Sequence, residues 1–518
     1  MIEMDDDRFL GLLSQRLGAY VRSRDDVEDK VVRLTSPEEL ARSFEEESGI
    51  ALRLEERQEE TSNETLLSAV DALLRYSVKT SHPLFLNQLY GRADVIGVGA
   101  DWTSTALNTN THTYEVAPAF TLMENALLSK IGRTIGWHGE DKNEVDGLFV
   151  PGGSLSNLYG MHVSRNVVDP EVATRGSHGG PRLVAFTSDQ SHYSYLKSAR
   201  LMGIGSDNLI AVESDAHGRM RPDALEESIE RARRDGGMPF FVGSTAGTTV
   251  LGAYDPLDKI SEVCARQGGL WHHVDACWGG GAMLSSRYRH VVRGIETTDS
   301  VAWNPHKMSG APLQCSVFLT RQPGVLKNAN ATNAAYLFQP DKLHGELDSG
   351  DKTIQCGRKT DMLKLWMLWK KRGDDGMASF VDRCFDLATF TGDVMRENED
   401  LGWKLAYEPS CANVCFWYVP ARLRQDARRF LQVEGQGEGE QETRFSRELH
   451  KVAPLVKSRM QREGDAMIGF QSVNGLPNFF RLVFPSGDAI GQSDVLEMLE
   501  RMRRFGEEEY EKFHRTSS

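Results

Sequence analysis

The sequence lacks any uninterrupted run of about 18 apolar residues, which is the shortest length that crosses a bilayer as a helix. Its first residues, MIEMDDDRFL, are acidic where a secretory signal is basic, and no continuous apolar segment follows them. The sequence therefore shows neither a membrane-spanning segment nor a secretory one. We expect a cytoplasmic protein with no membrane partner.

A surplus of positive charge is also absent. The 518 residues contain 60 lysines and arginines against 74 aspartates and glutamates, which gives a formal net charge of −14 at pH 7. A chain with this balance repels polyanions and has no global basic surface for nucleic acid or anionic lipid. We expect no nucleic-acid partner, and an anionic small substrate would require a locally positive pocket.

Cysteine is sparse and shows no paired framework. Seven cysteines are scattered through the chain, and the closest pair, Cys411 and Cys415, lies at the apolar run VCFWYV. This pattern excludes a small disulfide scaffold and fits a reducing cytosol. The close pair is typical of a buried strand rather than of a metal site, so we expect no metal.

The composition that is present is that of a large globular protein, with 40% apolar and 26% charged residues. This length predicts two or three closely packed domains. Residues 1–82 are charged and helical in pattern, as in TSPEELARSFEEESG, where Ser36 is a candidate N-cap. We predict an N-terminal helical segment over this range.

Short apolar, β-branched runs alternate with helical stretches between residues 147 and 320. The runs are GLFV, LVAFTS, LIAVES, FFVGST, LWHHVDA, SVAWN and CSVFL. Such alternation predicts an α/β fold in which helices wrap a mainly parallel sheet. We place this large domain at residues 83–385.

A second pattern follows Asp361. The tract MLKLWMLWKKRG predicts a long helix, and CANVCFWYV and NFFRLVF predict strands of a smaller α+β domain. We place this C-terminal domain at residues 386–518. Between its strands, the acidic low-complexity stretch 435–442 predicts an exposed loop.

Candidate ligand groups fall where strands end and helices begin, which is where sites form in such sheets. Residues 152–157, GGSLSN, follow the strand GLFV and open a helix. Their backbone N–H groups and hydroxyls are placed to hold a phosphate at a positive helix end. A glycine-rich turn that binds no ligand is the alternative interpretation.

Two charged residues follow at later strand ends. Asp275, in HVDACWGGG, is costly there unless it pairs with a cation such as a protonated pyridine nitrogen, or simply caps a turn. Lys307, in NPHK, is an ordinary surface charge if taken alone, but opposite a phosphate cradle it can form a Schiff base with an aldehyde cofactor. Along the chain, the glycine turn is followed by His192 in SHYS, Thr249 in GTT, Asp275 and Lys307. This order favours the cofactor hypothesis.

These segments together resemble the group II decarboxylases that depend on pyridoxal 5'-phosphate (PLP). The similar branch contains glutamate, cysteine sulfinate and animal aspartate decarboxylases. The resemblance covers roughly residues 82–505, and it is carried by NTHTYEVAP, PGGSLSNLYG, SHYSYLKSA, AGTTVLGAYDPL, HVDACWGGG, SVAWNPHKMSGAPLQCSVFL, YLFQPDK, SGDKTIQCGRKTD, NVCFWYVP, LHKVAPLVKSRM and NFFRLVF.

The resemblance implies the type I fold of aspartate aminotransferase, with a mainly parallel seven-stranded sheet in the large domain. It implies that Lys307 forms the Schiff base, that Asp275 pairs with the pyridine nitrogen and that His192 stacks on the ring. Thr249 would lie near the ring and its 3-oxygen. Phosphate contacts are implied for Gly153, Ser154, Ser156 and His306, and substrate contacts for Gln88, Asn110, His112 and Arg481, of which Arg481 would bind a carboxylate.

The chain departs from the family at two places. The loop DKLHGELDSGDK is one residue shorter and has His344 where a tyrosine protonates the substrate in the neighbouring subunit's site. Histidine can donate a proton near neutral pH, although a solvated loop histidine is the alternative. Asn110 matches the glutamate pattern, whereas His112 replaces an aromatic residue and either bonds a side-chain anion or forms a packed wall.

Three functions follow as hypotheses. The first is decarboxylation of a small acidic L-amino acid: aspartate to β-alanine, glutamate to GABA, or cysteine sulfinate to hypotaurine. The second is PLP-dependent transamination or aldehyde-forming oxidation, which the missing tyrosine motivates. The third is a catalytically silent homologue that acts as a partner protein, and the joint presence of Lys307, Asp275, His192 and Arg481 argues against it. The resemblance also implies a homodimer with sites at the interface.

Overall fold

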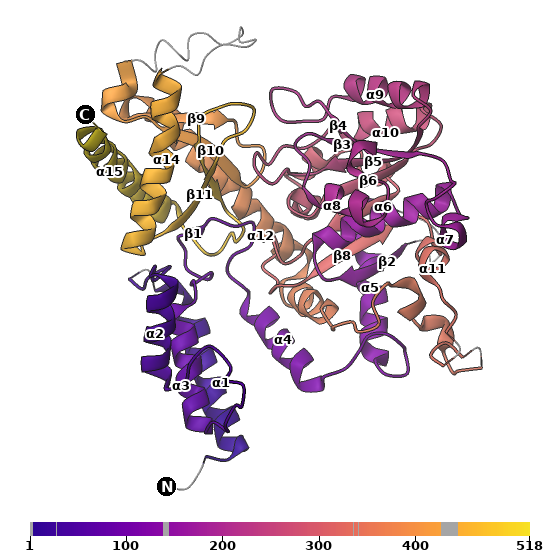
Figure 1. Cartoon of the computed structure of the whole chain (residues 1–518), viewed down its shortest axis with the longest axis horizontal. Coiled ribbons are helices and arrows are strands. Elements are labelled where there is room, and N and C mark those ends of the chain that lie inside the picture. Colours follow the sequence, from indigo (N-terminus) through magenta and orange to yellow (C-terminus); the bar gives the residue numbers. More distant parts are fainter. Residues whose placement is uncertain are drawn as a thin grey trace.

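The computed structural model describes residues 4–26, 28–137, 145–334, 336–339, 341–425 and 444–517. An N-terminal group of helices, a large α/β unit and a smaller α+β unit follow one another along the chain (Figure 1). This order confirms the predicted fold class. The low-complexity stretch 435–442, predicted to be an exposed loop, lies outside the described residues.

The N-terminal segment forms three helices that extend away from the two larger units (Figure 1). They are α1 (Asp6–Arg22), α2 (Pro37–Ser48) and α3 (Asn63–Tyr76). Ser36 caps α2 by accepting a hydrogen bond from the Glu39 backbone, which confirms the predicted cap. The helices share only a small core around Phe44, so this segment buries little apolar surface of its own.

The large unit contains the predicted seven-stranded sheet. Its spatial order is β2 (Asp146–Val150), β8 (Ser316–Thr320), β7 (Ser300–Trp303), β6 (Trp271–Ala276), β5 (Met238–Thr245), β3 (Leu183–Ser188) and β4 (Leu209–Val212). Strands β7, β6, β5, β3 and β4 run parallel, whereas β8 is antiparallel to both of its neighbours. The mainly parallel sheet is therefore confirmed.

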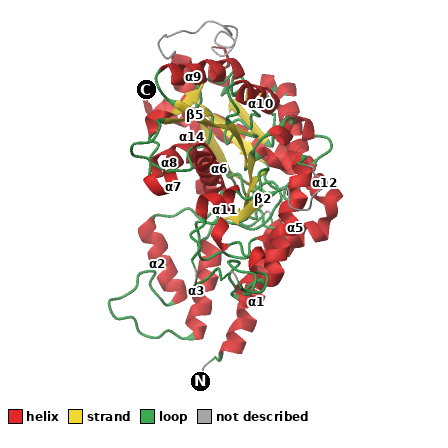
Figure 2. Cartoon of the chain, turned by 90° about the vertical axis from the view of Figure 1, so that its right-hand side faces the viewer, coloured by secondary structure: helices red, strands yellow, loops and turns green. Residues whose placement is uncertain are grey.

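Helices cover both faces of this sheet (Figure 2). Alternate residues of β3 enter different cores: Ala185 packs with α6 (Gly153–Val168) and α8 (Ser194–Leu201), while Phe186 packs with α9 (Pro222–Arg234) and α10 (Leu257–Arg266). Successive strand residues point to opposite faces, so the two cores lie on opposite sides. Burial on both sides explains why these strands read as continuous apolar runs. Further helices of this part of the chain are α4 (Val95–Leu107), α5 (Pro118–Ile135), α7 (Val172–Arg175) and α11 (Val325–Asn330).

The C-terminal unit is a five-stranded sheet with helices against it. The spatial order is β1 (Phe85–Leu86), β11 (Met467–Gln471), β12 (Phe479–Val483), β10 (Asn413–Tyr418) and β9 (Trp403–Tyr407). Helices α14 (Arg444–Glu463) and α15 (Gln492–Ser517) complete the unit. Cys415 lies within β10 and Cys411 just before it, both buried, which confirms the buried strand expected there.

Two elements depart from the predicted domain boundaries. Strand β1 belongs to residues assigned to the large domain, yet it pairs in parallel with β11 of the C-terminal sheet. Helix α12 (Met362–Glu397) crosses the predicted boundary between residues 385 and 386 and kinks at Gly373, where φ is 65°. Local sequence patterns do not encode pairing over such separations. The division into domains otherwise stays a prediction.

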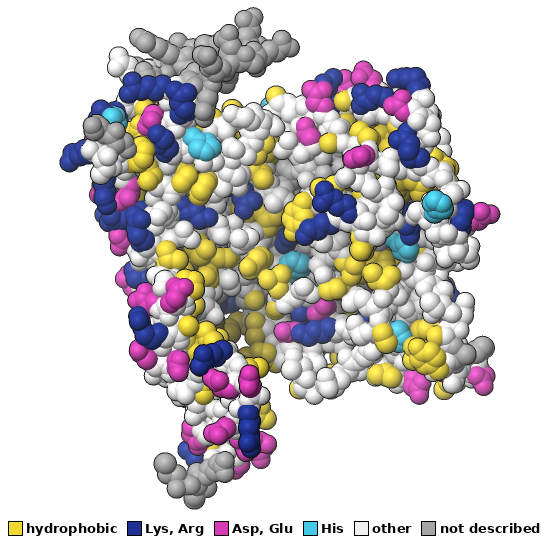
Figure 3. Space-filling model, in the orientation of Figure 1, with side chains coloured by type: hydrophobic (Ala, Val, Ile, Leu, Met, Phe, Trp, Pro, Cys, Tyr) yellow, Lys and Arg dark blue, Asp and Glu magenta, His cyan; other side chains and the backbone are white. Residues whose placement is uncertain are grey.

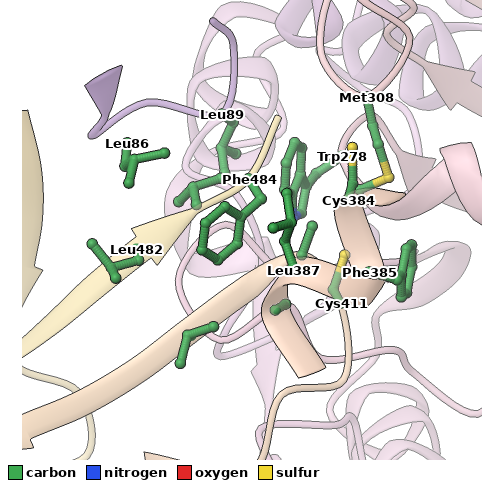
Figure 4. Packing of buried hydrophobic residues seen from close by; sticks show 14 of the residues in the cluster. Leu86, Leu89, Trp278, Met308, Cys384, Phe385, Leu387, Cys411, Leu482 and Phe484 are labelled. Carbon is green, nitrogen blue, oxygen red and sulfur yellow. The ribbon is translucent and has the colours of Figure 1, made fainter. Parts of the chain in front are cut away.

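One apolar cluster joins the large and C-terminal units (Figure 4). Trp278 and Met308 of the large unit pack near Leu387 of α12 and Phe484, which follows β12. Trp278 also donates its indole N–H to Asn413 of β10 at 2.6 Å. Trp278, which follows β6, is therefore held by contacts to both units.

The described residues were compared with the requirements of a membrane span, a disulfide and a metal site. No helix among them is long and apolar enough to span a bilayer. All seven cysteines are free thiols, and Cys356 is the exposed one. No group of three or more potential metal ligands occurs in the described ranges.

Candidate active site

A cavity of about 150 Å³ opens at the carboxyl ends of the parallel strands. This is where loops and helix N-termini converge in sheets of this kind. Its lining comes from the ends of β5, β6 and β7 and from the start of α6, and it consists of Gly153, Ser154, Asn157, His192, Tyr193, Thr245, Gly247, Thr249, Asp275, Cys277, Trp278, Asn304 and Lys307.

Lys307 lies in the turn that follows β7. Its backbone N–H closes the turn on the Asn304 carbonyl at 3.0 Å, and its side chain is half-buried. Within the described chain, no carboxylate forms an ion pair with its ammonium group. An amine at a cavity wall without a fixed partner is free to react with an aldehyde.

Asp275 is buried at the end of β6. It accepts hydrogen bonds from the Asn157 amide at 2.8 Å and from the Cys277 backbone N–H at 3.0 Å. Burial alone would raise the pKa of Asp275, but the interaction with His192 and these hydrogen bonds outweigh it and hold the pKa below its usual value. The cavity therefore presents a fixed negative charge to whatever ring enters it.

His192 lies beside the same cavity. Its Nδ1 is 2.8 Å from the Ser194 hydroxyl, so that nitrogen is already engaged. Burial lowers the pKa of His192, and Asp275 opposes this effect only in part. A neutral imidazole with one nitrogen committed leaves its ring face and Nε2 for a ligand.

The start of α6 forms a cradle suited to a phosphate. Gly152, with φ of 102°, turns the chain out of β2, and a side chain on Gly153 would collide with Cys277 and Asn304. The first turn of the helix therefore presents its backbone N–H groups closely to the cavity, as anion binding requires. Ser154 lies in the lining beside them.

Two predicted phosphate contacts lie behind this lining. Ser156 is fully buried and donates its hydroxyl to the Val317 carbonyl at 3.3 Å. His306 is also buried, and its Nδ1 lies 2.7 Å from the Cys315 carbonyl. Neither side chain is among those that line the cavity, because each is satisfied by β8 or the loop before it. Both side chains are thus engaged by other parts of the fold, and their implied phosphate contacts stay predictions.

Arg481, in β12, lies against the cavity loop. It donates to the Thr249 carbonyl at 3.0 Å and to the Asn87 carbonyl at 2.8 Å. Its Nε is buried and has no hydrogen-bond partner within the described residues. The guanidinium therefore keeps donors for an anion, and Gln88 is next to one of its anchors.

Three predicted residues do not join the cavity around Lys307. Asn110 accepts a hydrogen bond from the Arg358 backbone at 2.8 Å, and buried His112 packs on Phe338 with ring centroids 5.4 Å apart. His344 is exposed, with its ring 5.3 Å from that of Tyr114. Within one chain, Asn110, His112 and His344 therefore lie apart from Lys307, and the resemblance had implied that the loop with His344 reaches the neighbouring subunit's site; their roles stay predictions.

A buried ion pair anchors this second group. Arg358 and Glu124 pair with almost no exposure, and Arg358 also donates to the Thr111 carbonyl at 2.8 Å and the Ser349 hydroxyl at 2.7 Å. Glu124 in turn accepts from the Phe149 backbone at 2.8 Å. The pair thus ties β2, just before the phosphate cradle, to the loop that carries His344.

Sequence reasoning gave no role to several lining residues. Asn304 Oδ1 is buried without a partner in the described part of the chain, and it faces the same cavity as Lys307. Asn157 hydrogen-bonds Asp275. Both residues occur inside segments that the sequence singled out, NPHK and GGSLSN, but only the fold shows that their amides turn toward the cavity.

Three histidines in and near the site are buried. Burial lowers the pKa of His272 to about 3 and those of His273 and His306 to about 4. Burial also raises the pKa of Asp255 to about 7. A raised carboxyl pKa stabilises the fold as the pH falls, whereas a lowered histidine pKa destabilises it. Unfolded histidine titrates near 6.5, so the histidine contribution is complete above about pH 6.5 and is lost as the pH falls toward 4.

Acidification is therefore expected to destabilise the protein. Between about pH 7 and pH 5 each of these three histidines lowers the free energy of unfolding by about 2 kcal/mol, and Asp255 offsets about one of them. These four groups together therefore lower it by about 4 kcal/mol. Urea unfolding of the cofactor-free protein at several pH values measures this loss. His272→Gln should make the loss smaller, while exposed His217→Gln should leave it unchanged. Identical losses in both variants would contradict the assignment.

The geometry defines a class of protein before any comparison is made. A reactive lysine, a buried carboxylate, an imidazole and a helix-end anion cradle around one cavity are what a phosphorylated pyridine aldehyde requires. In agreement, the conserved domain described as "Pyridoxal-dependent decarboxylase conserved domain" matches residues 47–419. The chain belongs to this family: it is an amino acid decarboxylase, and its cofactor is PLP.

Three similar proteins illustrate the family to which the chain belongs. The chain is 42% identical over 485 residues to a Bos taurus protein named acidic amino acid decarboxylase GADL1, covering 93% of this chain and 87% of the relative. The crystal structure of mouse CSAD is 38% identical, with a TM-score of 0.88, and the match covers 97% of this chain and 100% of CSAD. A rice (Oryza sativa) TDC structure with PLP and tryptamine, 21% identical with a TM-score of 0.83 and covering 98% of each chain, shows the same fold.

Proposed function

We propose that the chain decarboxylates a small acidic L-amino acid, with aspartate, glutamate and cysteine sulfinate as the candidates. The observation that carries this proposal is Arg481, a half-buried arginine beside the cavity whose Nε is buried and has no partner among the described residues. Because the α-carboxylate leaves as carbon dioxide, a permanent arginine serves a second anionic group of the substrate. The name of the bovine relative supports the same substrate class.

The lining residues divide the work in this proposal. When bound, PLP supplies an aldehyde and an electron-accepting ring. Lys307 contributes the amine that holds it, and Asp275 keeps a negative charge at the ring nitrogen. The first N–H groups of α6 hold the phosphate. His192 covers one ring face, while Thr249 connects the cavity to Arg481.

The test is a substrate panel. Purified protein with PLP is incubated with each of the three acidic amino acids and with leucine, and carbon dioxide, amine, aldehyde and peroxide are quantified. Amine equal to carbon dioxide for at least one acidic substrate, with none from leucine, is the expected result. Aldehyde with peroxide would support the oxidase hypothesis instead. Turnover of leucine alone would exclude an acidic substrate.

We also propose that two copies of the chain form the working enzyme. The loop that carries His344 exposes Tyr336 at 81% and Leu343 at 79%, and Trp102 of α4 is exposed as well. Apolar side chains gather at the lower right in Figure 3, where this loop lies in Figure 1. Such surface is typical of an interface. In a dimer, the group around Asn110, His112 and His344 would serve the partner's cavity.

Mixed dimers test this arrangement. Lys307→Ala and His344→Phe chains should each be nearly inactive alone if His344 acts on the partner's site. Mixed in equal amounts, half of the dimers are hybrids with one intact site, so about a quarter of normal activity should return. The assay is amine formation after subunit exchange. No recovery on mixing, or full activity of His344→Phe alone, would contradict the proposal.

A reducing compartment such as the cytosol suits the thiols of this chain. Six of the seven free cysteines are buried, and burial raises the pKa of Cys264, Cys411 and Cys415 to about 12. Such thiols neither require nor readily form disulfides. We therefore propose a cytoplasmic enzyme.

A further inference from the structure

A buried chain of hydrogen bonds runs along one face of the sheet, from Trp271 at the start of β6 to Asp275 near its end. The Trp271 indole N–H donates to the Ser300 hydroxyl at 2.8 Å, and this hydroxyl lies 2.8 Å from Nδ1 of His273. Nε2 of His273 is 3.1 Å from Oδ1 of Asn157. The Asn157 amide then donates to Oδ2 of Asp275 at 2.8 Å.

Both ends of this chain set its direction. The indole can only donate, so Ser300 accepts from Trp271 and uses its own hydrogen for His273. At the other end the ionised carboxylate can only accept, so Asn157 must present its NH2 group there and its oxygen to His273. His273 is therefore the tautomer with hydrogen on Nε2. Every donor in the chain points toward Asp275.

The surroundings of His273 keep it neutral. Its ring lies against α6 at Gly160, where any side chain would collide with it. The rings of Tyr195, Phe241 and Phe318 surround it at centroid distances of 6.3, 5.8 and 6.2 Å. This apolar cage disfavours the charged imidazolium, so the single tautomer persists at neutral pH.

Asn157 also links the carboxylate to His192. The same amide nitrogen is 2.9 Å from the Ser194 hydroxyl, and that hydroxyl is 2.8 Å from Nδ1 of His192. One NH2 group thus donates to Asp275 and to the serine that orients the imidazole. The side chain is 1% exposed, so water does not substitute for these bonds.

We propose that Asn157, held by His273 and Ser300, is the positioning residue that keeps Asp275 ionised and thereby keeps the proton on the cofactor's ring nitrogen. This inference rests on the proposed role of Asp275. A carboxylate that has lost a donor binds a proton more tightly, so without Asn157 the shared proton moves from the ring nitrogen toward Asp275. A protonated ring is the stronger electron acceptor, which the reaction needs.

The experiment measures the ring nitrogen directly. The unaltered protein and its variants are loaded with PLP labelled with nitrogen-15 in the ring, and the nitrogen signal is recorded without substrate. Asn157→Ala and Asn157→Leu, of which leucine is close to asparagine in size but cannot donate, should both shift the signal toward the unprotonated position. The dissociation constant of PLP should rise about 10- to 100-fold, as expected for a lost hydrogen bond to a charged group. Ser300→Ala should shift the signal the same way by less.

A matched control separates this role from general packing. Ser244→Ala removes a hydroxyl 2.5 Å from the neighbouring buried His272, which no bond among the described residues joins to Asp275, so signal and affinity should not change. A normal signal and affinity in Asn157→Leu would overturn the proposal, because shape without donation would suffice. If the Asn157 variants do not fold, an unchanged signal in Ser300→Ala overturns it.

The same nitrogen signal also tests the role of Asp275 separately from the role of Asn157. An unprotonated ring nitrogen in the unaltered protein would overturn the role of Asp275 together with that of Asn157. Since no substrate is present, the result is independent of which amino acid the enzyme decarboxylates, and the substrate panel tests that separately.

Discussion

Replacing Lys307 with alanine is expected to abolish both the covalent attachment of PLP and decarboxylation. Lys307 is the lysine in the cavity lining, and no carboxylate of the described chain holds its amine in an ion pair. Removing the nucleophile of a catalytic unit lowers kcat on the order of 10⁴-fold or more. Borohydride reduction followed by peptide mass analysis measures the covalent link, and carbon dioxide release measures the activity.

The matched control is Lys259→Ala. Lys259 is an exposed lysine of α10 that pairs with Glu262 at 2.9 Å, so its loss should leave attachment and activity unchanged. Thermal unfolding of the cofactor-free proteins checks that both variants fold. A reduced cofactor recovered on any lysine other than Lys307 in the unaltered protein would contradict the assignment.

Arg481→Ala is expected to give the second large effect, on substrate binding. Truncating one partner of a buried, hydrogen-bonded charge pair costs about 2–5 kcal/mol, which corresponds to roughly 30- to 5000-fold in kcat/KM. Most of this should appear in KM, because the anion that Arg481 holds is bound before and after the reaction. Inhibition by the product amine should weaken by a similar factor, since the product retains that anion.

Conservative and remote variants make this result specific. Arg481→Lys keeps the charge but loses the planar donor set, so it should recover only part of the affinity. Arg503, which is partly exposed and pairs with Glu500 far from the cavity lining, should tolerate alanine without effect. Because Arg481 also donates to the carbonyls of Thr249 and Asn87, PLP affinity is measured in parallel. A change confined to PLP affinity, with normal KM, would show that Arg481 only supports the loop.

The elements of the large sheet follow closely from local sequence. LVAFTS coincides with β3, and SVAW and SVFLT are β7 and β8, because strands buried on both faces are short, apolar and β-branched. The glycine turn before α6 was equally readable. Strand β1 was not, because a two-residue strand has no periodicity and is defined only by its partner β11.

The sequence predicted site residues where a charged or ionisable side chain occurs at the end of an apolar strand, which is an unusual place for it. Lys307 and Asp275 at strand ends, and His192 earlier in the chain, were identified from residue type and order, and the fold brings all three to one cavity. For Ser156 and His306 the sequence implied phosphate contacts, and in the structure their side chains hydrogen-bond to the carbonyls of Val317 and Cys315. The direction of a side chain depends on these neighbours, which sequence order does not reveal.

By itself, the sequence determined the class of this protein: the order of strands and helices, the reactive lysine and the carboxylate that faces it. The order of elements follows from local periodicity. The site residues follow from charged side chains that cost free energy at a buried strand end unless they are paired. Only the tertiary structure decided which groups support them. The directed bonds from Trp271 through His273 to Asn157, and the separation of His344 from Lys307, arise from contacts between distant segments. Hydrogen-bond direction depends on every partner at once, so it exists only in the folded chain.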